Sequence, residues 1–415
     1  MKKMTVFVLV ALAAGLQSIS TSADSLRIDN ATIMTMGSMG TLQAADILIK
    51  DGEITAIGSD LSESADRVID ASGAIITPAM FAGATTTGLV EVNAVRESVD
   101  SSVSETPLSK LHVEFDVRRA YSPLSSLHAI TRTEGFGYTL LAAAGGQYSV
   151  AGVGSLVDFD GDFDSFSGDD TVFIDVNGYS SRKVGGSRAA HWMLLEGAMA
   201  DLDGRAREQE YLTQAGRDVL KRLQSDGIFV FAANRAADIK QVIGFAVKHD
   251  IDTVIVGARE AWMLADELAD LGIAVMINGL DNLPADFDSL GSRLDNAALL
   301  SDAGVTVMFT SDETHNARKI RQGAGTAVAY GMDYDLALQA MTTVPAEVFG
   351  GRSRVLAVGN SADLVVWSGD PLEVTSYATA VVIEGELTSM ESRQSKLLER
   401  YLPEDAGMGR AYINR

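Results

Sequence analysis

Two side chains near the end of the chain could do acid–base chemistry. Asp312 directly follows a mostly apolar run, 305–311, and His315 comes three residues later. A carboxylate and an imidazole at this spacing can act as general base and acid on one substrate. A structural interpretation is also open, in which Asp312 caps the helix expected near Asn316 or pairs with Arg318. Loop histidines without function are common, so His315 has a simpler interpretation too.

Few other residues offer metal-binding or nucleophilic chemistry. The remaining histidines form no HxH or HExxH pair, and the chain has no cysteine. Disulfides, thiolate catalysis and a cysteine-based zinc site are therefore excluded. The acidic run 158–164, followed by Asp169, superficially resembles a calcium-binding loop, but its glycine is misplaced and the closing glutamate is missing. We expect a solvated acidic loop there.

A basic cluster is a further candidate site. Arg182, Lys183 and Arg188 lie close together in an otherwise acidic chain. At the mouth of a pocket, these cations could bind a carboxylate or another anionic small molecule. A solvated loop far from any pocket is an equally good interpretation.

The middle of the chain alternates strand-like and helix-like segments, a pattern typical of a parallel α/β sheet or barrel. Helices are expected over 236–248 and 260–271, where apolar residues recur at helical spacing. Eight apolar runs, the number of strands in a (β/α)8 TIM-type barrel, are predicted at 76–83, 137–143, 154–158, 171–176, 228–233, 253–257, 273–278 and 305–311.

Short strands are expected at both ends of the chain. Asp51-Gly52 and Glu384-Gly385 are typical hairpin turns between apolar runs. Two strand-rich pieces around an α/β middle predict a small β-sandwich composed of both termini. The expected divisions are a leader, the first part of the sandwich, the barrel, the second part of the sandwich and a C-terminal helix with a tail, at 1–23, 24–75, 76–352, 353–392 and 393–415.

The first residues have the features of a secretory signal peptide. Lys2 and Lys3 precede an apolar run, and small residues end at Ala23. We therefore expect a periplasmic or secreted protein without a membrane span. The net charge of −23 disfavours binding to nucleic acid and to anionic membranes.

Several segments resemble one known family. Residues 76–88, ITPAMFAGATTTG, resemble the TPG-[LF]-[IV]-D-x-H-T-H-x-G segment that ends the first barrel strand of the amidohydrolase superfamily. Residues 358–373, VGNSADLVVWSGDPLE, resemble the closing strands of that family, and 340–350, AMTTVPAEVFG, resemble one of its helices. Because these segments occur in the same order, the chain resembles the imidazolonepropionase-like secreted members over nearly its whole mature length.

The resemblance implies a metal-dependent hydrolase of C–N bonds in cyclic amides or peptides. In that family a divalent metal, such as zinc, lies at the carboxyl-terminal mouth of the barrel and activates water. Its ligands are an HxH pair after strand one, histidines after strands five and six, and an aspartate after strand eight that also serves as base. Here the HxH positions carry Ala84 and Thr86, the strand-five histidine falls near Ala232 to Asn234, and the strand-six histidine falls near Val256. Only the aspartate, Asp312, is kept.

These departures lead to two hypotheses for the family activity. In the first, the metal site is degenerate, no cofactor is expected, and the chain is a non-catalytic partner of an active paralogue or binds a small ligand. In the second, Asp312 acts with His315 and a weakly held or absent metal. Asn234, Arg182 and Lys183 are the candidate ligand-binding residues, and Asp312 is the candidate for any metal. Oligomerisation through barrel helices is common for this fold, but nothing in the sequence specifies it.

Overall fold

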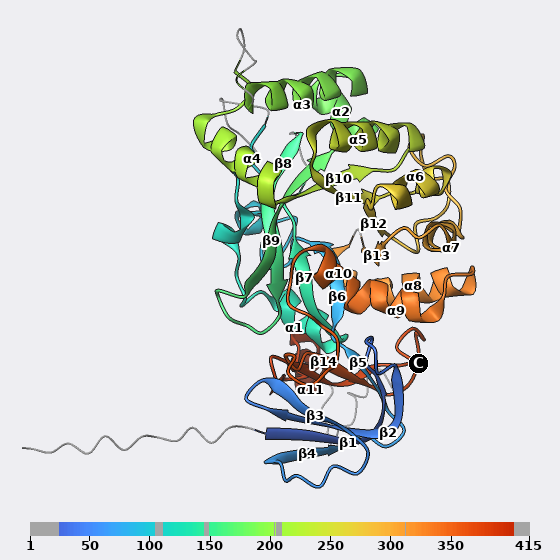
Figure 1. Cartoon of the computed structure of the whole chain (residues 1–415). Coiled ribbons are helices and arrows are strands. Elements are labelled where there is room, and N and C mark those ends of the chain that lie inside the picture. Colours follow the sequence, from blue (N-terminus) through green and yellow to red (C-terminus); the bar gives the residue numbers. More distant parts are fainter. Residues whose placement is uncertain are drawn as a thin grey trace, which may run out of the picture.

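Two eight-stranded sheets organise the molecule (Figure 1). The computed structural model describes residues 25–103, 111–144, 149–202, 204, 210–311 and 313–401. The expected signal peptide and Asp312 therefore lie outside the described residues. Across these ranges, no helix combines the length and apolar character needed to cross a membrane.

One sheet is the barrel, and its strands coincide with the eight predicted runs. Their order is sequential around the sheet, from the first strand to the last. The strands are β6 (Met80–Thr85), β7 (Phe136–Leu141), β8 (Val150–Asp158), β9 (Phe166–Asp175), β10 (Ile228–Ala233), β11 (Asp252–Gly257), β12 (Ala274–Ile277) and β13 (Val307–Phe309). The predicted TIM-type barrel is confirmed.

The first predicted run, 76–83, is divided between the two sheets. Its beginning is β5 (Ile75–Pro78), which pairs with strands of the second sheet, and β6 starts only at Met80. The change occurs at Ala79, whose N–H donates to the carbonyl of Asp363 at 2.9 Å, while the Met80 N–H donates to Gly135 at 3.0 Å. Continuous apolar sequence gave no sign of this division.

One barrel strand runs against the others. β8 is antiparallel to β7 and β9, whereas the remaining neighbours are parallel. The connections before and after β8, residues 142–149 and 159–165, are too short for the helical crossover that a parallel connection requires. As a result, β8 begins where its neighbours end, and Val150 lies opposite Ile174 of β9.

The barrel closes between β13 and β6 through side-chain contact. The Ala84 N–H donates to Oγ1 of Thr310, just beyond β13, at 3.1 Å. Gly83 makes this approach feasible, because it has a positive φ of 79° and any Cβ there would meet Thr310.

Helices surround the parallel part of the barrel (Figure 1). The predicted helix 236–248 is α5, which buries Ile239, Val242 and Ile243. The predicted helix 260–271 is broken into η3 (Ala261–Leu264) and α6 (Ala265–Asp270). The α-helices are α1 (Ser126–Thr133), α2 (Gly178–Val184), α3 (Arg188–Leu202), α4 (Gln214–Asp226), α5 (Ala236–His249), α6, α7 (Asn296–Asp302), α8 (Lys319–Ala329), α9 (Tyr334–Thr342), α10 (Val344–Val348) and α11 (Arg393–Tyr401).

The second sheet joins both ends of the described chain, as predicted, and lies below the barrel in Figure 1. Both predicted hairpins are present, with positive φ at Asp51, Gly52, Glu384 and Gly385, as type I′ turns require. The strands are β1 (Ser25–Met34), β2 (Thr41–Lys50), β3 (Glu53–Gly58), β4 (Arg67–Asp70), β5, β14 (Leu364–Trp367), β15 (Ala378–Ile383) and β16 (Glu386–Leu387).

A buried ionic cluster joins the second sheet to the amino end of the barrel. Arg354 is fully buried, donates to Asp363 at 2.9 Å and also pairs with Asp158 at the end of β8. Its guanidinium lies 4.3 Å from the ring centroid of Tyr138. Arg352 adds a second cation, 3.2 Å from Asp158 and 3.1 Å from Asp363. The expectation that Asp158 belongs to a solvated acidic loop is therefore wrong, because its arginine partners come from a distant part of the sequence.

Candidate functional site

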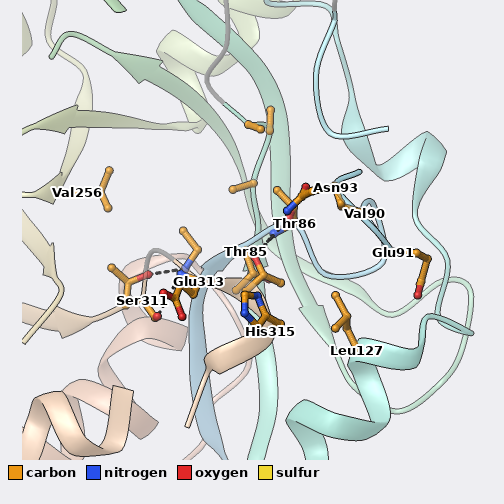
Figure 2. A pocket seen from close by; sticks show the side chains of 16 residues that line it. Thr85, Thr86, Val90, Glu91, Asn93, Leu127, Val256, Ser311, Glu313 and His315 are labelled. Atoms are coloured by element: carbon orange, nitrogen blue, oxygen red, sulfur yellow. Dashed lines mark hydrogen bonds between the residues drawn. The ribbon is translucent and has the colours of Figure 1, made fainter. Parts of the chain in front are cut away.

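A cavity of about 620 Å³ opens at the carboxyl ends of β6, β7, β11 and β13. We call it the mouth cavity. It lies where the resemblance expects the active site, and Figure 2 shows side chains from these separate strands around it. Its lining residues are Ala84, Thr85, Thr86, Val90, Glu91, Asn93, Leu127, Ala142, Ala143, Ala144, Val256, Thr310, Ser311, Glu313, Thr314 and His315.

Three positions that the resemblance assigns to metal-binding histidines line the mouth cavity. Ala84 and Thr86 belong to the end of β6 and the turn after it, and Val256 belongs to β11. Val256 lies on the far side of the cavity from Thr86 in Figure 2. All three positions therefore lie at the mouth, as the resemblance implies. Their side chains carry methyl, hydroxyl and isopropyl groups.

Hydroxyl groups provide much of the polar surface at this end of the barrel. Thr86 Oγ1 lies 3.4 Å from Thr314 Oγ1, and Thr85 Oγ1 lies 2.9 Å from Thr139 Oγ1. Thr139 in turn donates to the carbonyl of Gly83 at 2.7 Å. These hydroxyls were not predicted, because threonine is neither a typical metal ligand nor a typical acid or base. The run of three threonines at 85–87 was the available signal.

Of the two predicted catalytic residues, His315 is the one that lies in the described part of the chain, and it lines the mouth cavity. It lies in η4 (Thr314–Asn316), is exposed, and points among the central side chains of Figure 2. Its neighbour Glu313 also lines the cavity and pairs with Lys319 at 2.8 Å. The hydrogen bond from Lys319 holds the pKa of the Glu313 carboxyl below its usual value.

The carboxylates of the mouth cavity have no lysine or arginine beside them in its described lining. Glu91 accepts a hydrogen bond from Ser126 at 3.1 Å, and Glu313 is held from outside the lining by Lys319. Neither lysine nor arginine is among the described lining residues. The cavity is therefore a poor match for the anionic ligand that the basic cluster predicted.

The donor groups near the mouth also fit a zinc ion poorly. A catalytic zinc takes three protein ligands and keeps one open position. Within the described ranges, no three His, Cys, Asp or Glu side chains are grouped so that they could hold a metal ion. His315, Glu313 and Glu91 are the side chains of these types in the described lining, and Glu313 is engaged by Lys319.

Asn234 is near the barrel mouth but is not among the described lining residues of the mouth cavity. It follows β10, where its backbone N–H donates to Asn177 Oδ1 at 3.1 Å and its carbonyl accepts from Glu260 at 3.0 Å. Its side chain packs against Gly257, at which any Cβ would meet Asn234 Oδ1. Asn234 therefore holds the strand ends together.

Arg182 and Lys183 lie apart from the mouth cavity. Both are exposed on α2, and Arg182 lines a separate cavity of about 810 Å³. The Lys183 ammonium lies 4.2 Å from the centroid of the Tyr179 ring. The basic cluster and His315 therefore do not form one site in the described part of the chain.

A buried histidine that the sequence did not single out lies beside the carboxyl end of β9. His191 Nδ1 is 3.0 Å from Ser181 Oγ, and Nε2 contacts Ser149 Oγ. Ser181 donates to the Val176 carbonyl at 3.1 Å, so its oxygen accepts from Nδ1–H and Nε2 accepts from Ser149. Burial lowers the pKa of His191 to about 4, so the ring is neutral near pH 7. The reversal of β8 brings Ser149 to this end, which sequence spacing could not reveal.

Comparisons with known proteins agree with this fold. Residues 218–388 match the model of the amidohydrolase family. Amidohydrolase tasK of Hapsidospora irregularis is 37% identical over 90 residues, which are 21% of this chain and 9% of that protein. The 5′-deoxyadenosine deaminase of Methanosarcina acetivorans is 43% identical over 54 residues, 13% of this chain and 12% of that protein. The matches thus span only about a tenth of these curated relatives.

Solved structures extend the likeness to the whole fold. The amidohydrolase from Thermotoga maritima MSB8 has a TM-score of 0.77 at 20% identity, covering 88% of this chain and 99% of that one. Molinate hydrolase has a TM-score of 0.54 at 13% identity, covering 93% of this chain and 97% of that one. These solved structures share the fold of this chain, and the amidohydrolase family model matches its residues 218–388.

Proposed function

We propose that this protein binds a small ligand in the mouth cavity and does not carry the metal-dependent hydrolysis typical of its superfamily. One observation carries the proposal: Ala84, Thr86 and Val256 line the cavity at positions where the resemblance expects histidines. None of these side chains is a ligand of the kind that zinc selects.

The lining indicates the kind of ligand. Threonine and serine hydroxyls alternate with small apolar side chains, and the described lining contains carboxylates but no lysine or arginine. Such a surface suits a compact, uncharged or cationic molecule that both donates and accepts hydrogen bonds. The named relatives include an amidohydrolase and a deaminase, so an amide or amine is the ligand class we propose to screen first.

Elemental analysis tests the loss of the metal site. The protein is purified without chelator and without a metal-affinity tag, and its zinc, manganese and iron are measured. We expect less than about a tenth of an equivalent, whereas a site with three protein ligands retains close to one. One equivalent that remains after dialysis would overturn the proposal.

A chain that binds a ligand but lacks metal chemistry would be suited to work beside an active enzyme. We propose that an active paralogue with the full histidine set is the partner. Co-expression of the two chains tests this, with size-exclusion chromatography and the turnover of the active chain as readouts. A stable complex with altered turnover supports the role. Separate elution and unchanged turnover would leave ligand binding as the function.

Residual hydrolysis is the second candidate, and the position of His315 in the lining favours it. In this version Asp312 takes a proton from a water molecule that attacks the amide carbonyl, and His315 donates a proton to the leaving nitrogen as the C–N bond breaks. Asp312→Asn and His315→Gln are compared with the unchanged protein on a panel of cyclic amides and dipeptides. Turnover that survives chelator and is lost in both variants would favour the enzyme over the binding protein. Turnover that both variants keep would exclude these two residues from the chemistry.

We also propose export, supported by Lys2, Lys3 and the apolar run after them. Fractionation of cells that express the chain with and without residues 1–23 tests this. Equal cytoplasmic retention of both forms would contradict it.

A further inference from the structure

The second cavity at the carboxyl face of the barrel has features of a binding site. We call it the arginine cavity, and its volume is about 810 Å³. It lies among the segments that follow β9, β10 and β12, and it shares no described lining residue with the mouth cavity. Its lining residues are Gly178, Tyr179, Arg182, Gly186, Ser187, Arg188, Ala189, Arg235, Asp286, Phe287 and Asp288.

Two of its three arginines are fixed by carboxylates. Arg188 Nε donates to the buried Asp238 at 2.8 Å and Arg188 also pairs with Asp288. Arg235 donates to the other oxygen of Asp238 at 2.8 Å. Asp288 additionally accepts the Gly178 N–H at 2.7 Å. These contacts pair the carboxylates of Asp238 and Asp288 with arginines.

Arg182 differs from the other two. It is exposed on α2, and its guanidinium has no hydrogen-bond or ion-pair partner among the residues that the structure describes. The nearby carboxylate of Asp286 is occupied within its own loop, where it accepts from the Asp288 N–H at 2.9 Å and from Ser289 Oγ at 2.8 Å. Arg182 therefore presents a planar set of donors that matches the two oxygens of a carboxylate.

Two aromatic rings border the same cavity and remain open to solvent. Tyr179 is 71% exposed and Phe287 is 87% exposed. A flat apolar group placed against these rings would remove that surface from water and could stack on it. The Lys183 ammonium lies 4.2 Å from the Tyr179 ring centroid and adds positive charge to this side.

We propose that the arginine cavity is a second binding site, separate from the mouth, that takes an aromatic carboxylate. The carboxylate pairs with Arg182, and the aromatic group contacts Tyr179 and Phe287. A free aromatic acid and the C-terminal phenylalanine of a short peptide offer the same chemistry. The cavity volume of about 810 Å³ admits either.

Binding of matched probes tests the proposal. 3-Phenylpropionate is compared with its amide, which has the same shape without charge, and with propionate, which lacks the ring. The tripeptide Ala-Ala-Phe and its C-terminal amide form the peptide arm. Titration calorimetry on the full chain should show saturable binding of a carboxylate, with its amide at least about tenfold weaker, as loss of a charged hydrogen bond predicts. The arm that binds more tightly identifies the source of the ligand.

Variants connect the binding to the cavity. Arg182→Gln should abolish the preference for carboxylate over amide, while Arg182→Lys should keep part of it because the charge remains. Phe287→Ala should weaken the aromatic probes several-fold but not propionate. Arg222→Gln is the matched control, since it removes the same charge from an exposed residue of α4 that pairs with Asp170 at 2.7 Å.

Three outcomes would overturn the proposal. They are an absence of saturable binding of every carboxylate up to about 10 mM, amides that bind as tightly as carboxylates, and Arg182→Gln and Arg222→Gln variants that weaken binding equally. Thermal unfolding of each variant confirms that it is folded. Because the two cavities share no described lining residue, failure here leaves the proposed function of the mouth cavity intact, and failure there leaves this site intact.

Discussion

The two ends of the barrel use polar groups in different ways. At the amino end, Asp158, Arg354 and Asp363 are each at most 4% exposed and pair with one another between the two sheets. At the carboxyl end, the mouth cavity offers hydroxyls, two carboxylates and one exposed histidine, and three positions where the resemblance expects histidines carry apolar or hydroxyl side chains. The molecule thus combines an ionic, buried joint between its two sheets with an open mouth lined largely by hydroxyls and small apolar side chains.

The largest effect is expected at the buried ionic cluster. Arg354→Met leaves Asp158 and Asp363 buried with only the partly exposed Arg352 as counter-charge, and should lower the free energy of unfolding by about 3–5 kcal/mol. Chemical denaturation measures this. Arg222→Gln, which breaks an exposed pair, should change stability by less than about 1 kcal/mol. Equal losses in the two variants would mean that the cluster is not the main polar link between the sheets.

Lowering the pH should reduce the free energy of unfolding by a smaller amount. The pKa of His191 and that of His128 are lowered to about 4 by burial, below the value of 6.5 expected in the unfolded chain. The unfolded state therefore binds more protons between these values, so stability falls as the pH is lowered from about 6.5 towards 4. From pH 7 to 5 each histidine should remove about 2 kcal/mol. His191→Gln should reduce this slope, whereas His315→Gln, at the exposed mouth, should keep it; identical slopes would contradict the assignment.

Variants at two threonines distinguish the hydrogen bond that closes the barrel from the contacts that line the cavity. Thr310→Val removes the acceptor of the Ala84 N–H and should lower the free energy of unfolding by about 1–2 kcal/mol. Thr86→Val loses only a weak contact at 3.4 Å and should cost less than about 0.5 kcal/mol. The two variants are compared by thermal unfolding. A larger loss for Thr86→Val would indicate that the mouth hydroxyls are structural.

The smallest expected effect is that of added zinc. A ligand that binds only the folded state at 100 times its Kd stabilises that state by about 2.7 kcal/mol. Because the described donors near the mouth do not group into a metal site, zinc or manganese should leave the Tm unchanged. An increase that is abolished by Asp312→Asn would show that a metal site persists at the carboxyl end.

Much of the fold could be predicted because local patterns and family segments agree. The Asp51-Gly52 and Glu384-Gly385 turns fix hairpin registers within a few residues, and each barrel strand is an apolar run. Two features of the fold that were not predicted depend on contacts between residues far apart in the sequence. The solvated interpretation of Asp158 was wrong because Arg354 meets it across the sheets, and the division of the first run at Ala79 follows from a bond to Asp363.

The sequence predicted where the candidate site lies better than it predicted which side chains belong to each cavity. Ala84, Thr86, Val256 and His315 all line the cavity at the expected mouth. Arg182 could not be assigned to its own cavity, because the loop that carries Phe287 follows a different strand and is brought to α2 only by the closed barrel. The role of Asp312 remains a prediction, since that residue lies outside the described ranges.

The second sheet also determines when this protein can finish folding. β5 pairs with β14 on one edge, and Trp367 of β14 donates to Thr77 of β5 at 2.9 Å. During synthesis β5 is made early, but its partner emerges only after the whole barrel, so that edge stays open until then. Open strand edges attract other chains, and contacts between distant residues form slowly. A ribosome that stops before residue 364 would therefore release a chain whose N-terminal strands are prone to aggregate.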